Sequence, residues 1–318
     1  MDKLYIGIDT SCYTTSVACI RHESIVLDER AVLSVPLGTR GLRQSDALFQ
    51  HNRNLPELLA RVFPAVDAAE IAGVGVSATP TAAPDSYMPV FLAGVLAAKS
   101  LAYGRDVPCA MLTHQLGHVR AALHGNETLL ENDAFLALHL SGGTTDVLSV
   151  RCTGRTVAAI EPLGGSTDLH AGQFVDRVGV RLGLPFPCGK ALEALALKAE
   201  AGGIRFPSAV RGLRCSLSGA ESQAQRLLDE GARPEEVAYG VYDCLARTVA
   251  KLIGHAAEAA ACKRVLLSGG VASSLLLRKL LANRLDGDIR LLFGASALSS
   301  DNAVGVAFAA REALCNRR

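Results

Sequence analysis

The chain has 318 residues, of which 49% are hydrophobic, and its 32 basic and 31 acidic side chains give a net charge of +1. This length predicts about two domains with buried cores, and the composition excludes a chain that is disordered throughout. The balanced charge, the absence of tryptophan and the 5% of aromatic residues argue against a protein whose whole surface binds nucleic acid or stacks on bases.

The N-terminal segment and the cysteines favour a cytoplasmic protein with no membrane partner. The chain enters a strand pattern at Leu4 without the architecture of a signal peptide. The longest uncharged apolar run, residues 88–98, contains Pro89 and Gly94 and is too short to span a bilayer, so it predicts a buried helix. The nine cysteines are scattered without a Cys-x-x-Cys pair, which is typical of reduced, mostly buried thiols.

A strand, polar turn and strand pattern occurs twice along the chain. Residues 4–9 and 16–20 are apolar runs around a polar turn, and residues 135–140 and 147–150 flank a second such turn. The sequence of residues 14–17 is closely repeated at residues 144–147. This duplication predicts two similar lobes, one formed by residues 1–130 with a C-terminal helix at 301–318, the other by residues 131–300.

Glycine-rich turns follow two of the predicted strands. Ser141, Gly142 and Gly143 follow the strand at 135–140, and Gly269 and Gly270 follow a strand at 264–267 that leads into a helix from Ser273 to Leu281. A strand, a glycine turn and a helix N-terminus together favour binding of a nucleotide phosphate. Ordinary β-hairpins remain the alternative for the first turn. Helical patterns at 47–63 and 235–261 complete an α/β interpretation with a ligand cleft between the lobes.

Two histidines at helical spacing form a candidate metal site. His114 and His118 are four residues apart, so on a helix their imidazoles project from one face and can chelate a divalent cation. Asp301, before a small-residue helix at 306–314, is the candidate third ligand. Two alternatives stay open: partly exposed helix histidines, and a helix-capping role for Asp301. Gln115 stands where a zinc protease has its glutamate, so peptidase chemistry lacks a general base.

In order and spacing, these segments resemble the TsaD family of bacterial threonylcarbamoyl-transferases, from residues 7–12 to residues 300–303. The resemblance implies the two-lobed actin/Hsp70/sugar-kinase (ASKHA) fold, with a metal, iron or zinc, on His114, His118 and Asp301. It also implies an adenine nucleotide, threonylcarbamoyl-AMP or ATP, near a further set of residues: Ser141, Gly142, Gly143, Thr144, Asp176, Gly189, Gly269, Gly270 and Ser274.

The chain also departs from the family pattern, as a divergent paralogue would. The acidic pair of the family's opening motif is Tyr13-Thr14 here, Thr144 stands in place of a histidine, and the family's Leu-Lys pair is Ala220-Glu221. No residue is assigned a catalytic role. The alternatives are a non-catalytic nucleotide- and metal-binding paralogue, or a carbamoyltransferase that acts on another acceptor.

The activity implied by the resemblance is transfer of a threonylcarbamoyl group from threonylcarbamoyl-AMP to an anticodon-loop adenosine of tRNA. Helper subunits would share the binding of tRNA, since the chain itself is nearly neutral. A set of four arginines could contact tRNA phosphates, although a solvated surface explains them equally well: Arg205, Arg211, Arg214 and Arg226.

Overall fold

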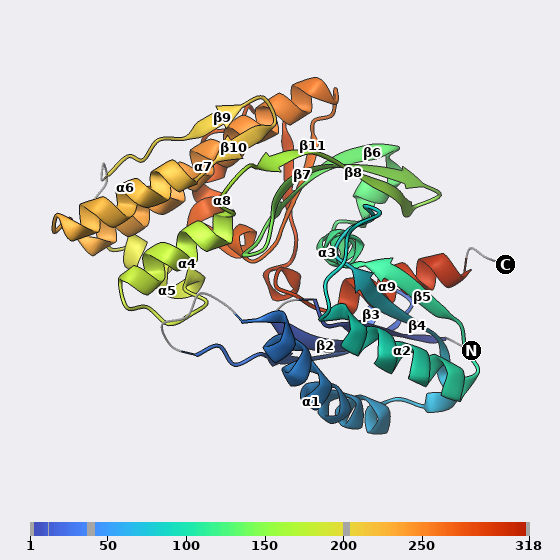
Figure 1. The fold of residues 1–318 in the computed structure, drawn as a ribbon. Coiled ribbons are helices and arrows are strands. Elements are labelled where there is room, and N and C mark those ends of the chain that lie inside the picture. Colours follow the sequence, from blue (N-terminus) through green and yellow to red (C-terminus); the bar gives the residue numbers. More distant parts are fainter. Residues whose placement is uncertain (1–2, 12, 37–41, 200–203, 316–318) are drawn as a thin grey trace. The chain divides into compact units, whose positions relative to one another are not determined.

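The computed structural model describes residues 3–11, 13–36, 42–199 and 204–315, which form two compact units (Figure 1). The first unit consists of the described residues of Met1–Pro36, Gly41–His124 and Ala297–Arg318, and the second consists of those of Gly125–Ser296. Cys12 of the opening motif and residues 316–318 of the predicted C-terminal helix lie outside the described residues.

The first unit is built on a five-stranded sheet with the order β3-β2-β1-β4-β5. Strands β1, β2 and β3 are antiparallel neighbours, whereas β4 and β5 run parallel to β1. The strand predicted at 4–9 is confirmed as β1, and the one predicted at 16–20 lies within β2. The bounds are β1 Leu4–Asp9, β2 Thr14–Arg21, β3 Ser24–Val32, β4 Ile71–Thr79 and β5 Cys109–Thr113.

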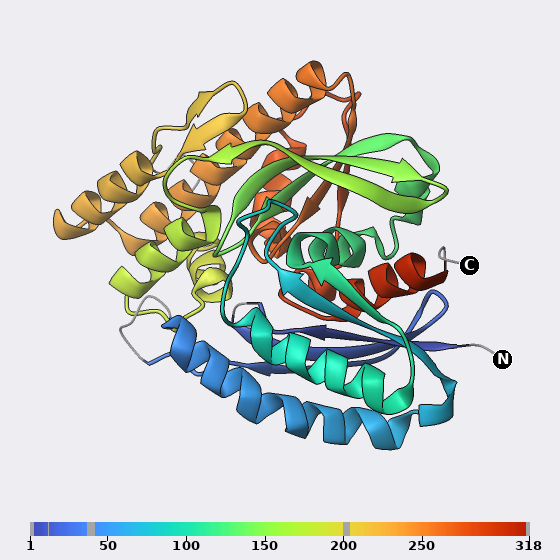
Figure 2. The same ribbon diagram turned by 45° about the vertical axis from the view of Figure 1, so that its right-hand side comes forward.

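Helices cover both faces of this sheet, α1 and α2 on one face and α9 with α3 on the other (Figure 2). Ile6 and Ile8 pack with α1 and α2, while Tyr5 and Ile20 pack with Phe308 of α9. The sheet is therefore buried on both sides, which explains why β1 has no exposed residue. The bounds are α1 Gln44–Val62, α2 Phe91–Arg105, α3 His114–Leu123 and α9 Val304–Cys315, with short 3₁₀ turns at Phe63–Ala65, Ala68–Glu70 and Ser296–Leu298.

The second unit contains a seven-stranded sheet with the order β12-β11-β6-β7-β8-β10-β9. Its central part, β8-β7-β6-β11-β12, repeats the first sheet: three antiparallel neighbours are followed by two parallel strands. The duplication predicted from the two polar turns is thus present in the strand order. The bounds are β6 Ala134–Leu140, β7 Thr145–Thr153, β8 Thr156–Ser166, β9 Ala209–Arg211, β10 Arg214–Ser216, β11 Arg264–Ser268 and β12 Arg290–Phe293.

The core of the second unit is organised around the long helix α7, whose side chains at Val237, Val241, Leu245 and Val249 are buried. The helix predicted at 235–261 ends two residues early, because Ala261 adopts a left-handed conformation (φ 47°) that stops it. The bounds are α4 Ala171–Arg181, α5 Gly189–Ala196, α6 Ser218–Asp229, α7 Pro234–Ala259 and α8 Leu275–Ala282, with 3₁₀ turns at Glu127–Glu131 and Val271–Ser273.

Two further findings concern the apolar character of the helices and the state of the cysteines. None of the described helices combines the length and the apolar character needed to cross a membrane. The cysteines of the described residues are free thiols, and most of them are buried.

Candidate metal centre and glycine turns

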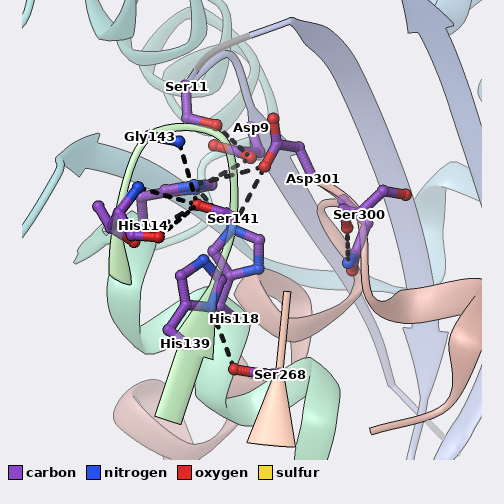
Figure 3. Close-up of polar contacts among 12 residues, drawn as sticks. Asp9, Ser11, His114, His118, His139, Ser141, Gly143, Ser268, Ser300 and Asp301 are labelled. Atoms are coloured by element: carbon purple, nitrogen blue, oxygen red, sulfur yellow. Dashed lines mark hydrogen bonds and ion pairs between the residues drawn. The ribbon is translucent and has the colours of Figure 1, made fainter. Parts of the chain in front are cut away.

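Helix α3 begins directly at the end of β5 and carries both histidines on one face. Thr113 caps the helix by accepting a hydrogen bond from the backbone N–H of Leu116, at 3.1 Å. One helical turn separates His114 from His118, and their Nε2 atoms lie 2.8 Å apart (Figure 3). The side chain of His118 is only 6% exposed and that of His114 19%, so these are not ordinary surface histidines.

Asp301 brings a carboxylate to the same point. Its Oδ1 lies 3.3 Å from His118 Nε2 and 3.7 Å from His114 Nε2. The three ligand atoms thus form a compact triangle, within 4.8 Å of one another. From these distances, a point equidistant from the three atoms lies about 1.9 Å from each in their common plane, close to the 2.0–2.2 Å of zinc bonds to imidazole and carboxylate. A cation slightly out of this plane would lie at the zinc bond length from all three atoms, so the donor set fits one divalent cation.

The close approach of α3 to α9 places Asp301 beside the histidines. A Cβ atom at Gly305 would lie 1.9 Å from the carbonyl oxygen of Gly117 and 2.6 Å from the backbone nitrogen of Ala121. Only glycine fits at this contact. Gly117 lies between the two histidines in sequence, and Gly305 follows Asp301 by four residues, in the first turn of α9, so this contact holds the ligand-bearing segments together.

The alternative role of Asp301, capping of α9, can be tested by comparing its side chain with that of the neighbouring Asn302. The side-chain oxygen of Asn302 accepts a hydrogen bond from the backbone N–H of Val304 at 3.1 Å, where α9 begins. The carboxylate of Asp301 instead faces the two imidazoles (Figure 3). This orientation favours the ligand interpretation.

A second carboxylate, which the sequence analysis did not assign to the site, lies behind His114. Asp9, the last residue of β1, is fully buried, and its Oδ2 lies 3.3 Å from His114 Nδ1 and accepts a hydrogen bond from the Ser11 hydroxyl at 3.0 Å. A charged residue that ends an otherwise apolar central strand was the signal available in the sequence, because ligand sites form at the carboxyl ends of such strands.

The surrounding groups shift the pKa values of the two histidines in opposite directions. Burial disfavours the charged form of His114, but the carboxylates of Asp9 and Asp301 outweigh it and raise the pKa of His114 above its ordinary value. Burial and the neighbouring His114 lower the pKa of His118, against the opposing effect of Asp301. At neutral pH His118 is therefore an uncharged imidazole, the form that binds metal.

In the second unit, the two predicted glycine turns lie side by side. Strands β6 and β11 are parallel neighbours, with Ser268 opposite His139, so the turns that follow them meet at the same edge of the sheet. The His139 Nδ1 and Ser268 Oγ atoms are 3.0 Å apart there. Gly269 has φ 94°, and a Cβ atom at that position would lie 2.3 Å from the carbonyl oxygen of Leu140, so the sharp turn requires glycine.

The first glycine turn is shaped by its own serine. The Ser141 hydroxyl oxygen accepts hydrogen bonds from the backbone N–H groups of Gly143 and Thr144, at 3.3 and 3.1 Å. A Cβ atom at Gly142, Gly143 or Gly270 would meet open space, in contrast to Gly269. These three positions thus leave the backbone open to close approach by a ligand.

Three of the remaining predicted nucleotide residues lie on or next to helices: Asp176 in the middle of α4, Gly189 at the start of α5 and Ser274 before α8. Asp176 on α4 accepts a hydrogen bond from the backbone N–H of Cys188 at 2.7 Å, next to Gly189 at the start of α5. Burial raises the pKa of Asp176, although this hydrogen bond opposes the shift. Ser274 caps α8 by accepting a hydrogen bond from the N–H of Leu277 at 3.1 Å, and the helix begins at Leu275 rather than at Ser273 as predicted.

Asp168 anchors the start of α6 through hydrogen bonds from Ser216, Ser218 and Leu217. Partial burial opposes ionisation, but these bonds hold the pKa of Asp168 well below its usual range. The stabilisation by ionised Asp168 is therefore complete above the ordinary carboxyl pKa of about 4 and declines progressively as the pH falls from there toward the lowered pKa of the folded state. We expect Asp168→Asn to lower the free energy of unfolding by about 1 kcal/mol at pH 7, since the site is exposed, and by progressively less in acid. Urea unfolding between pH 7 and pH 3 measures this, and a pH-independent difference would contradict it.

The four arginines predicted to contact tRNA phosphates are all exposed. Arg211 and Arg214 are register partners across the short β9–β10 pair, and Arg226 pairs with Glu230 at 3.6 Å. Their exposure fits both a phosphate-binding surface and a solvated one.

The fold belongs to the ASKHA class, as the repeated strand order indicates. The chain is similar to component A of (R)-2-hydroxyglutaryl-CoA dehydratase from Acidaminococcus fermentans, with a TM-score of 0.60 and 17% identity over 98% of this chain and 99% of the other. It is also similar to a ROK family glucokinase from Streptomyces griseus, with a TM-score of 0.54 and 13% identity over 97% and 99% of the two chains. The predicted fold class is confirmed.

The family is shown by the sequence itself. Residues 39–308 match the model of TsaD, described as tRNA N6-adenosine threonylcarbamoyltransferase. A protein of that name from Neorickettsia sennetsu is 27% identical over 98% of this chain and 94% of its own length. The chain therefore belongs to the TsaD family, as the resemblance of its motifs indicated.

Proposed function

We propose that this protein is a metal-dependent transferase that moves a threonylcarbamoyl group from threonylcarbamoyl-AMP to an anticodon-loop adenosine of tRNA. The observation that carries the proposal is the convergence of His114, His118 and Asp301 within 4.8 Å in a chain that belongs to this family. A purely structural role for these histidines would not require both Nε2 atoms and a carboxylate oxygen to converge on one point.

The first unit would supply the cation site. His114 and His118 would provide imidazole nitrogens and Asp301 a carboxylate oxygen, a donor set suited to iron or zinc. The bound ion would act as a Lewis acid toward an oxygen of the threonylcarbamoyl group. Among the protein's own groups, the buried Asp9 would keep His114 oriented, and the contact of Gly117 with Gly305 would keep the ligands at a fixed separation.

The second unit would hold the adenylate. The backbone at Gly142, Gly143 and Gly270 is open to close approach, and N–H groups in such turns hydrogen-bond phosphate oxygens. Asp176, which already accepts a hydrogen bond from the N–H of Cys188, would also accept hydrogen bonds from sugar hydroxyls. Gly189 would let the backbone at the start of α5 approach the nucleotide, since a Cβ atom there meets open space.

The tRNA would be bound together with helper subunits. A net charge of +1 gives this chain little long-range attraction for a polyanion, and the exposed arginines near β9 and β10 would supply only part of the phosphate contacts. A tRNA substrate and reduced cysteines would place the protein in the cytoplasm.

The test is direct analysis of modified nucleosides. The full chain would be incubated with Fe(II) or Zn(II), threonylcarbamoyl-AMP and unmodified tRNA, with and without cellular partner proteins, and digested tRNA analysed by mass spectrometry. We expect threonylcarbamoylated adenosine with the wild-type chain and none with Asp301→Ala. His255→Ala, which changes an exposed histidine of the second unit, is the matched control and should retain the product.

The same assay separates the alternatives. Bound metal and nucleotide without any modified adenosine, under every partner combination, would favour a non-catalytic paralogue. A carbamoyl group found on a different acceptor would favour a carbamoyltransferase of another specificity. Either result would overturn the proposed reaction.

A further inference from the structure

The environment of Asp9 restricts where the proton of His114 can lie. Asp9 is fully buried, its Oδ2 lies 3.3 Å from His114 Nδ1, and within the described residues no hydrogen bond reaches its Oδ1. A carboxylate with an unpaired buried oxygen strongly favours a donor at its other oxygen. A neutral His114 therefore carries its proton on Nδ1, because an unprotonated Nδ1 would set its lone pair against the carboxylate.

This proton position determines the state of the second histidine. In this neutral Nδ1–H form, His114 Nε2 presents a lone pair, and it lies 2.8 Å from His118 Nε2. Two bare nitrogens would repel at that distance, so His118 carries its proton on Nε2 while no metal is bound. Asp301 Oδ1, 3.3 Å from the same nitrogen, provides a second acceptor for that N–H.

We propose that Asp9 is a positioning residue that fixes His114 in the Nδ1–H form, so that metal binding requires a change of tautomer only at His118. A divalent cation would take the place of the proton on His118 Nε2, and that proton would move to Nδ1, so the neutral imidazole keeps one proton. His114 would bind with no rearrangement. This inference rests on the metal site of the proposed function, but not on the transfer reaction.

Nuclear magnetic resonance of the full chain with ¹⁵N-labelled histidine tests the proton positions directly. Spectra at pH 9, well above the ordinary pKa of histidine, would be recorded before and after addition of Zn²⁺, with His114→Gln used to assign the signals. We expect His114 to be protonated on Nδ1 in both spectra, and His118 to change from Nε2–H to Nδ1–H on addition of zinc. The proposal would be overturned if neutral, metal-free His114 carried its proton on Nε2, or if the proton position on His118 did not change when zinc is added.

The affinity for Zn²⁺ provides an independent readout. We expect Asp9→Asn, which keeps the side-chain shape, to raise the dissociation constant about 10- to 100-fold, as is typical when a carboxylate behind a ligating histidine is lost. The matched control is Thr10→Val, which removes a buried hydroxyl that donates to Val90 O and accepts from the Gly94 N–H, without changing a metal ligand. It should lose stability but keep the affinity.

The outcomes separate this inference from the proposed reaction. An Asp9→Asn variant that binds Zn²⁺ as tightly as the wild type, or a Thr10→Val variant that loses as much affinity, would contradict a positioning role. An affinity that depends on Asp9 in a protein that never modifies tRNA would support the inference and reject the reaction.

Discussion

Replacing Asp301 or His118 by alanine is expected to reduce bound zinc or iron from about one ion per chain to a trace, because two ligands alone rarely retain a cation against buffer. Each substitution removes one corner of the triangle that the three ligand atoms form. The metal content of freshly purified protein, and again after dialysis with excess Zn²⁺, would be measured by plasma mass spectrometry.

The control for this experiment is His255→Ala. His255 is exposed on α7, and its Nδ1 lies 2.7 Å from the carbonyl oxygen of Gly212, outside the cluster of ligands. Its loss should leave one ion per chain. Equal metal content in all three variants and the wild type would show that the ion, if present, is held elsewhere.

Gly305→Ala is expected to be the most damaging substitution of a single small residue. The added Cβ atom would lie 1.9 Å from the carbonyl oxygen of Gly117, a backbone atom that cannot rotate away. Helices α3 and α9 must therefore separate, at a cost of about 3 kcal/mol of unfolding free energy. Because the separation moves both histidines away from Asp301, we also expect the affinity for Zn²⁺ to fall at least about 10-fold.

Thermal and urea unfolding would measure the first effect, and titration with Zn²⁺ the second. Gly254→Ala is the matched control, since Gly254 also lies in a helix but a Cβ atom there meets open space. Alanine should be tolerated at that site or should stabilise the helix slightly. A Gly305→Ala variant with wild-type stability and wild-type affinity would mean that the tight contact between the helices does not hold the ligands.

Local patterns predicted the elements that carry the site. The apolar run at 4–9 specifies β1, the four-residue spacing of His114 and His118 specifies one face of α3, and the strand order around the two polar turns is duplicated as their sequences indicated. These features depend on periodicity and on turn residues, which the sequence displays directly.

The parts that sequence patterns missed depend on contacts distant in the chain. Asp9 and His114 are brought together by the sheet, where β1 pairs with β4 and β4 with β5, and no local signal links them. Likewise, no sequence pattern links Gly117 with Gly305, because their contact forms only when α3 and α9 pack. Element ends also shifted: α8 starts at Leu275 because Ser274 caps it, after a 3₁₀ turn that the helical pattern did not distinguish.

One cation shared by two imidazoles and one carboxylate is the central feature proposed for this protein, and anomalous X-ray diffraction tests it most directly. Crystals of the full chain with Zn²⁺ would be measured on both sides of the zinc absorption edge. We predict a single strong peak about 2.0–2.2 Å from His114 Nε2, His118 Nε2 and a carboxylate oxygen of Asp301. A zinc peak bound by other residues, or none in zinc-saturated crystals, would contradict the account.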